Sequence, residues 1–180
     1  LFQSSLLLRY AGILAALGWL LFVGVRVGAA IIDHLNIESL DDLERLGFSL
    51  GVGWGVMATV MAVLGLLGLW RLPLVFGTLA VLTVWGVIDM RRERTNRGRA
   101  ATLRLEPIDR VLGGLILAFA ALNLFCAFVP EIFYDALVYH LALPELYWIR
   151  HGFVATPHNI YSGIPMLTEM LYGLALPLGG

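Results

Sequence analysis

Long apolar runs alternate with short polar segments along the chain, and this alternation predicts its elements. Four runs are long or nearly long enough to cross a bilayer as helices, for which about 20 apolar residues suffice, and a fifth run follows them. The runs are residues 6–32, 46–70, 74–88, 108–129 and 164–178. The pattern therefore predicts an all-α, polytopic helical membrane protein with about five transmembrane helices.

The segments between the first three runs predict how their helices are joined. Residues 33–45 are acidic, and Ser39 with Asp42 resembles a capping box, so we expect a short surface helix that acts as a solvated connector. The sequence Arg71-Leu72-Pro73 predicts a tight turn. The second and third runs should then form an antiparallel hairpin.

Glycines in the second run suggest a close helix contact. Gly47, Gly51 and Gly55 recur at intervals of four residues. Small residues at this spacing allow two helices to approach closely in lipid. This stretch is not a phosphate-binding loop, because no strand precedes it and no Lys-Ser/Thr pair follows it. No run carries a polar stripe at helical spacing, which argues against a channel or transporter.

Composition supports a membrane location. The chain is 59% hydrophobic and 14% charged, whereas soluble domains are nearer half apolar and a quarter charged. The net charge of −1 gives no reason to expect a nucleic-acid partner. Cys126, the single cysteine, lies in an apolar run, and we expect it to be a small buried hydrophobe.

The distribution of charge predicts the topology. Residues 89–104 hold six arginines and two acids, and positive charge in short loops marks the cytoplasmic side. Residues 130–162 then form an extracytoplasmic loop, in a protein that we expect in a bacterial inner membrane. Arg9 and Arg26 lie near the ends of the first run and should extend to the interfaces.

The loop after the fourth run carries the candidate chemistry. Glu131, Asp135 and Tyr139 lie four residues apart, so a helix over 131–142 would place them on one face at the membrane surface. Asp135 could act as a general base on a hydroxyl, or hold a divalent cation near a phosphate. Alternatively, the acids only solvate the outer face of this helix.

Other polar residues have possible roles near Asp135. His140 could orient the carboxylate or bind phosphate. Pro144 can start a second short helix, over 144–151, which Gly152 would end. Glu169 is an ionisable residue in the fifth run, so it either lines a substrate groove or faces water near the helix start. No pair of histidines has zinc-ligand spacing, and no metal-binding residue is predicted from the sequence.

Two stretches resemble polytopic glycosyltransferases of the GT-C superfamily, relatives of protein O-mannosyltransferases and aminoarabinose transferases. They are residues 133–148 (FYDALVYHLALPELYW) and 158–172 (HNIYSGIPMLTEMLY). The resemblance implies a polyprenyl-phosphate sugar donor, an extracytoplasmic acceptor and inversion at the anomeric carbon. Asp135 matches the family's acidic residue, which is a catalytic base or a metal ligand.

The resemblance also implies roles for residues near Asp135. Tyr139 and His140 would position Asp135 or contact phosphate, and Arg150 could pair with phosphate. Many relatives have two adjacent acids where this chain has Asp135-Ala136, which weakens the case for a metal. The resemblance covers residues 108–178.

Residues 1–107 match nothing in that family and would form a separate N-terminal membrane region, with 108–180 as the start of a GT-C-like module. The family builds its donor site from later loops and spans. We therefore expect this chain to be the N-terminal portion of a longer polypeptide, inactive alone. The rival hypothesis is a non-catalytic membrane subunit or scaffold that packs against other subunits of a larger complex, such as an energy-transducing assembly.

Overall fold

Helices make up nearly all of the described chain in the computed structural model, which covers residues 2–37, 40–96, 107–128, 133–163 and 166–179. These residues contain no strand. The elements are α1 (Phe2–His34), α2 (Asp42–Leu66), α3 (Leu72–Asn96), α4 (Pro107–Cys126), η1 (Ala136–His140), α5 (Ala142–Arg150), η2 (Ile160–Gly163) and α6 (Leu167–Gly179). The prediction of an all-α helical membrane protein is confirmed.

Four helices are long and apolar enough to cross a membrane. Their candidate spans are Leu8–His34, Asp42–Leu66, Leu72–Arg91 and Pro107–Cys126. The fifth apolar run forms α6, which has 13 residues in the described chain. At about 1.5 Å per residue α6 is about 20 Å long, shorter than the roughly 30 Å of a hydrocarbon core.

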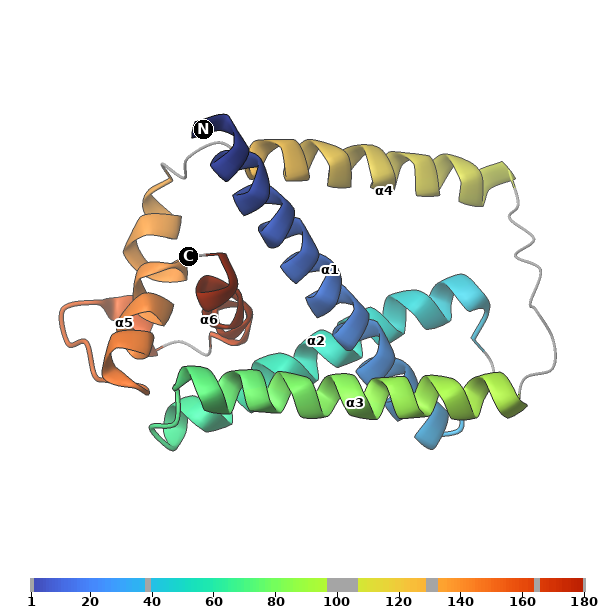
Figure 1. Ribbon diagram of the computed structural model, residues 1–180, viewed down its shortest axis with the longest axis horizontal. Coiled ribbons are helices and arrows are strands. Elements are labelled where there is room, and N and C mark those ends of the chain that lie inside the picture. The colour runs from blue at the N-terminus through green and yellow to red at the C-terminus, as the bar shows by residue number, and fades with distance from the viewer. Residues whose placement is uncertain (1, 38–39, 97–106, 129–132, 164–165, 180) are drawn as a thin grey trace.

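The two ends of the bundle carry different parts of the chain (Figure 1). α2 and α3 are joined by a short turn at residues 67–71 and run in roughly opposite directions (Figure 1). Both pack against α1, which crosses them obliquely, and they make few contacts with each other. The tight turn predicted at Arg71-Leu72-Pro73 lies earlier, because Leu72 and Pro73 begin α3. Residues 133–163 lie at the end of the bundle that holds the turn between α2 and α3. The arginine-bearing end of α3 and the start of α4 lie at the other end (Figure 1). The segment that holds Asp135 and the C-terminal end of α3 are thus separated by the length of the bundle.

α1 and α2 touch through a face that the sequence analysis did not select. A Cβ at Gly53 would overlap the carbonyl group of Gly24, and a Cβ at Gly28 would overlap that of Ser49. Gly51, in contrast, has nothing within 4 Å of its Cβ position. The same is true of Gly47 and Gly55. A close contact between helices through small residues is therefore present, as predicted. It is made by Gly53, however, and not by Gly47, Gly51 and Gly55.

The start of α2 corrects the prediction of a separate acidic surface helix. Asp41 is the N-cap, and its Oδ1 accepts hydrogen bonds from the backbone N–H groups of Leu43 and Glu44 at 2.9 and 2.8 Å. The Glu44 carboxylate in turn accepts from the Asp41 N–H at 3.1 Å. This capping box starts a single helix that continues into the membrane span. Ser39, the predicted cap, lies outside the described residues.

Arg26 does not extend freely to an interface as predicted. Its guanidinium donates to the carboxylate of Asp89 on α3 at 3.1 Å, and the two side chains are 14% and 24% exposed. Gly86 lies against the Arg26 side chain, one helical turn before Asp89. The pair joins the first and third spans through paired charges. Arg9 is exposed.

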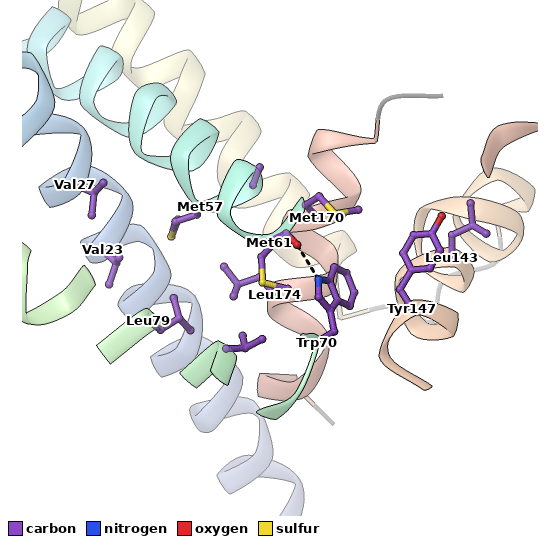
Figure 2. Packing of buried hydrophobic residues seen from close by; sticks show 12 residues of the cluster. Val23, Val27, Met57, Met61, Trp70, Leu79, Leu143, Tyr147, Met170 and Leu174 are labelled. Atoms are coloured by element: carbon purple, nitrogen blue, oxygen red, sulfur yellow. Dashed lines mark hydrogen bonds between the residues drawn. The ribbon is translucent and has the colours of Figure 1, made fainter. Parts of the chain in front are cut away.

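A core around Trp70 fastens the segment 133–163 to the bundle (Figure 2). Trp70 is fully buried, and its indole N–H donates to the carbonyl of Met61 at 2.8 Å. The backbone N–H of Trp70 donates to the carbonyl of His151 at 3.0 Å. The rings of Tyr147 and Trp148 contact the indole with centroids 5.9 and 5.6 Å away. The α2–α3 turn is therefore the anchor of α5.

α4 has no buried residue within the part of the chain that the structure describes. Figure 1 places most of α4 apart from α2 and α3, with its last turn beside the start of α1. Tyr10 of α1 meets Phe128, just beyond α4, in an edge-to-face contact with centroids 5.1 Å apart. Cys126 is exposed here, so the expectation that it is buried is wrong. An apolar helix with this exposure is suited to lipid on all sides.

Candidate functional site

Asp135 is exposed and directly precedes a π-helix, Ala136–His140. The N–H of Leu141 donates to the carbonyl of Ala136 at 3.0 Å, five residues earlier. The predicted regular helix over 131–142 is therefore wrong between 136 and 140, and Glu131 lies outside the described residues. Single π-turns are rare and frequently occur at functional sites.

The π-turn changes which residues share a face with Asp135. In an α-helix, residue i+4 lies close to residue i, whereas a π-turn bonds i to i+5 and brings that residue near as well. Tyr139 and His140 therefore both lie near the side of the turn that holds Asp135. The sequence spacing predicted this for Tyr139, but His140 would have pointed away in a regular α-helix.

His140 and Glu169 form a direct pair between η1 and α6. The His140 Nδ1 lies 2.6 Å from Oε1 of Glu169. The Glu169 side chain is 10% exposed and that of His140 is 35% exposed. Glu169 is thus nearly enclosed, with the imidazole between it and the surface. The sequence analysis had selected both residues but had not linked them.

Aromatic rings surround this pair. The Tyr139 ring stacks on that of Tyr161, with centroids 4.2 Å apart and planes 21° from parallel. The His140 ring lies 4.1 Å from that of Tyr139 and 6.2 Å from that of Tyr172. Stacking at these distances restricts the rotamers of Tyr139 and His140. His140 is therefore held in place by aromatic rings as well as by its contact with Glu169.

A short loop brings Tyr161 to the site. The Asn159 Nδ2 donates to the carbonyl of Val138 in the π-turn at 3.1 Å, and its Oδ1 accepts from the N–H of Tyr161 at 3.0 Å. The second bond forms an Asx-turn, in which an Asn side chain accepts a hydrogen bond from the backbone N–H two residues later. The sequence analysis assigned no role to Asn159 or Tyr161, although the Asn-x-Tyr spacing was a usable signal for the turn.

The surroundings of Tyr139 are electrically negative. Its phenol pKa is raised from the ordinary value, first by desolvation and then by the charges of Asp135, Tyr161 and Glu169. A negative field opposes loss of a proton from the phenol and favours positive charge. Tyr147, on α5, also has a raised pKa, because it is buried.

Metal ligation has little support among the described residues. They contain no group of three or more His, Cys, Asp or Glu side chains that could hold an ion. Asp135 has Ala136 beside it, and the Glu169 carboxylate is engaged by His140. A divalent cation at this site would therefore depend on ligands from the substrate more than on the protein.

Arg150 lies away from the Asp135 side of the segment. α5 has 9 residues, so Arg150 is about 13 Å along the helix axis from the end that adjoins His140. Together with His158 and Pro157 it lines an open cleft of about 570 Å³. The structure thus brings together Asp135, Tyr139, His140 and Glu169, but not Arg150.

An apolar cleft adjoins the site. It has a volume of about 450 Å³ and lies between the end of α2, α5, the loop 153–162 and the start of α6. Its lining includes Phe153, Ser162, Met166 and Met170. Ser162 and Met170 follow Tyr161 and Glu169 in the sequence, so the loop and α6 contribute residues both to the cleft and to the polar cluster.

Comparison of the chain with protein-family models, with curated proteins and with solved structures finds no match in any of the three.

Proposed function

We propose that the protein is a GT-C-like membrane glycosyltransferase that moves a sugar from a polyprenyl-phosphate carrier to an extracytoplasmic acceptor. The observation that carries the proposal is the exposed carboxylate of Asp135, which lies at the end of a membrane bundle beside Tyr139 and the His140–Glu169 pair. A carrier of this type presents its sugar and phosphate at the bilayer surface. A carboxylate at that level can therefore reach the reacting atoms.

The setting of Asp135 supports transfer chemistry in two ways. Its side chain is open to a substrate, while its backbone is held in a π-turn that the loop braces through Asn159. The apolar cleft of about 450 Å³ offers a surface for the first isoprene units of a carrier. Two roles are compatible with this carboxylate: it accepts the proton of the acceptor hydroxyl, or it faces the positive charge that develops on the sugar.

Orientation is part of the proposal. The segment 133–163 and the C-terminal end of α3, where the arginine-rich stretch begins, lie at opposite ends of the bundle (Figure 1). With the arginines in the cytoplasm, the site faces the periplasm of a bacterial inner membrane. In this orientation the donor and acceptor meet outside the cytoplasm.

Replacing Asp135 by asparagine tests the proposal in the full-length protein, reconstituted with a polyprenyl-phosphate sugar and an acceptor. We expect the transfer rate to fall about 100-fold or more, because the amide keeps the shape but removes the charge. Radiolabelled sugar transfer measures the rate. Membrane insertion and the thermal unfolding midpoint should stay unchanged, because Asp135 is exposed.

Glu145→Gln is the matched control, because Glu145 is an exposed acid on α5 in the same segment. This variant should transfer at the rate of the unmodified protein. Equal rates for the Asp135 variant and the control would refute the proposal. So would labelling of the segment 133–163 from the cytoplasmic side of intact cells.

A second candidate function is a non-catalytic subunit of a larger membrane complex, which the exposure of α4 favours. No residue of α4 is buried within the described chain. A helix of this kind can receive another membrane protein as readily as lipid. A stable complex with other membrane proteins after gentle solubilisation, together with undiminished function of the Asp135→Asn variant in that complex, would favour this alternative.

A further inference from the structure

We propose that His140 is the group that removes the proton from the acceptor hydroxyl and that Glu169 is the residue that positions it. This inference rests on the proposed function and refines it. It leaves Asp135 to face the developing positive charge of the sugar. A nearly enclosed carboxylate holds Nδ1 of a partly exposed imidazole, near an exposed aspartate.

The contact between Glu169 and His140 fixes the tautomer of the ring. An ionised carboxylate can only accept hydrogen bonds, so the proton between the two residues belongs to Nδ1. In the neutral imidazole, Nε2 then carries the lone pair. Within the described residues, no hydrogen bond to Nε2 of His140 is present. The free lone pair is the feature that a general base requires.

The charges around His140 favour a base over a phosphate-binding group. The titratable groups near it are Asp135 and Tyr139 on its own segment, Tyr161 on the loop, and Glu169 and Tyr172 on α6. None of these is cationic, and two are acids. A second anion, such as a phosphate, would be repelled by these two acids. The earlier hypothesis of a phosphate contact by His140 is therefore the weaker one.

The reaction step conserves atoms and charge. The acceptor O–H bond breaks and its proton moves to Nε2 of His140. The hydroxyl oxygen forms a bond to the anomeric carbon as the bond from that carbon to the phosphate oxygen breaks, and the electron pair leaves with the polyprenyl phosphate. Glu169 stabilises the imidazolium that forms, as the buried carboxylate does in a Ser-His-Asp triad. The imidazolium then releases its proton to water.

Kinetics of three variants test the assignment in the full-length protein reconstituted in nanodiscs. His140→Gln should lower kcat by roughly 100- to 10,000-fold with little change in KM. Glu169→Gln should also lower kcat strongly, because its amide can donate to Nδ1 and favour the wrong tautomer. Glu169→Asp, which retains the charge, should recover part of the rate.

Nitrogen NMR of isotope-labelled histidine gives a readout that does not depend on turnover. In alkaline solution His140 should carry its proton on Nδ1 in the unmodified protein, and Glu169→Gln should shift that proton toward Nε2. His34→Gln is the control, because His34 is an exposed histidine at the other end of the bundle. It should alter neither the His140 signals nor the rate.

The outcomes separate this inference from the proposed function. Transfer by the unmodified protein with full activity in His140→Gln, or with a tautomer that Glu169→Gln does not change, would overturn this inference alone. Absence of sugar transfer by the unmodified protein would overturn both. A folded Glu169→Gln variant, judged by its thermal unfolding midpoint, with the predicted tautomer change and loss of kcat would support both.

Discussion

Replacing Gly53 by alanine should destabilise the bundle by about 2–3 kcal/mol, the upper part of the range for overpacking a tight contact. The new methyl group would overlap the carbonyl group of Gly24, so the two helices must move apart. Alanine is otherwise the better helix former by about 1 kcal/mol. The cost of separating the two helices must therefore exceed the gain in helix propensity. The free energy of unfolding in mixed micelles of lipid and denaturing detergent measures the change.

Gly51→Ala is a matched control, two residues away on the same helix. Nothing lies within 4 Å of its Cβ position, so only the gain in helix propensity remains. We expect no loss of stability and a gain of up to about 1 kcal/mol. Opposite signs for the two alanine variants would confirm the α1–α2 contact. Equal effects would mean that α2 faces α1 through a different side.

Replacing Trp70 by alanine should cost about 3–5 kcal/mol, the usual cost of removing a large buried aromatic side chain. The indole is fully buried and packs against Tyr147 and Trp148, and its N–H satisfies the Met61 carbonyl. Its loss also removes the ring on which α5 rests. Unfolding by detergent measures the stability, and hydrogen exchange should increase most in α5 and the loop after it.

Trp85→Ala controls for the general effect of losing a tryptophan. Trp85 is 42% exposed on α3, so its removal leaves no comparable cavity, and we expect a change below about 1 kcal/mol. Trp70→Phe would keep an aromatic ring but lose the hydrogen bond, and should fall between the two alanine variants. A Trp70→Ala protein as stable as Trp85→Ala would contradict the anchoring role of the α2–α3 turn.

The spans were predictable because each needs only a long apolar run. A turn between the second and third runs was predictable too, but it lies at residues 67–71, because Leu72 and Pro73 already belong to α3. The facing residues were harder. α2 is apolar on all sides, so periodicity does not reveal which glycines face α1. Gly51 and Gly53 look equivalent in the sequence, and only the position of α1 distinguishes them. Asp41 was missed as the cap because Ser39 offered a similar local pattern.

In the candidate site, too, contacts between residues near in sequence were predicted and contacts between distant residues were not. The proximity of Asp135 and Tyr139 follows from local spacing and was predicted. The contact between His140 and Glu169 joins residues 29 apart, through a π-turn and an irregular loop, and no local pattern encodes it. Arg150 was grouped with them because its charge suits phosphate. The length of α5 places it elsewhere.

The ion pair between Arg26 and Asp89 has a consequence for how the protein is made. The two residues are 63 positions apart, so α1 reaches the translocon before its counter-ion has been translated. At ribosomal speeds of roughly 5–20 residues per second, the delay is on the order of several seconds. During that time Asp89 is not yet available to Arg26. The contact between the first and third spans therefore forms only after α3 has been made.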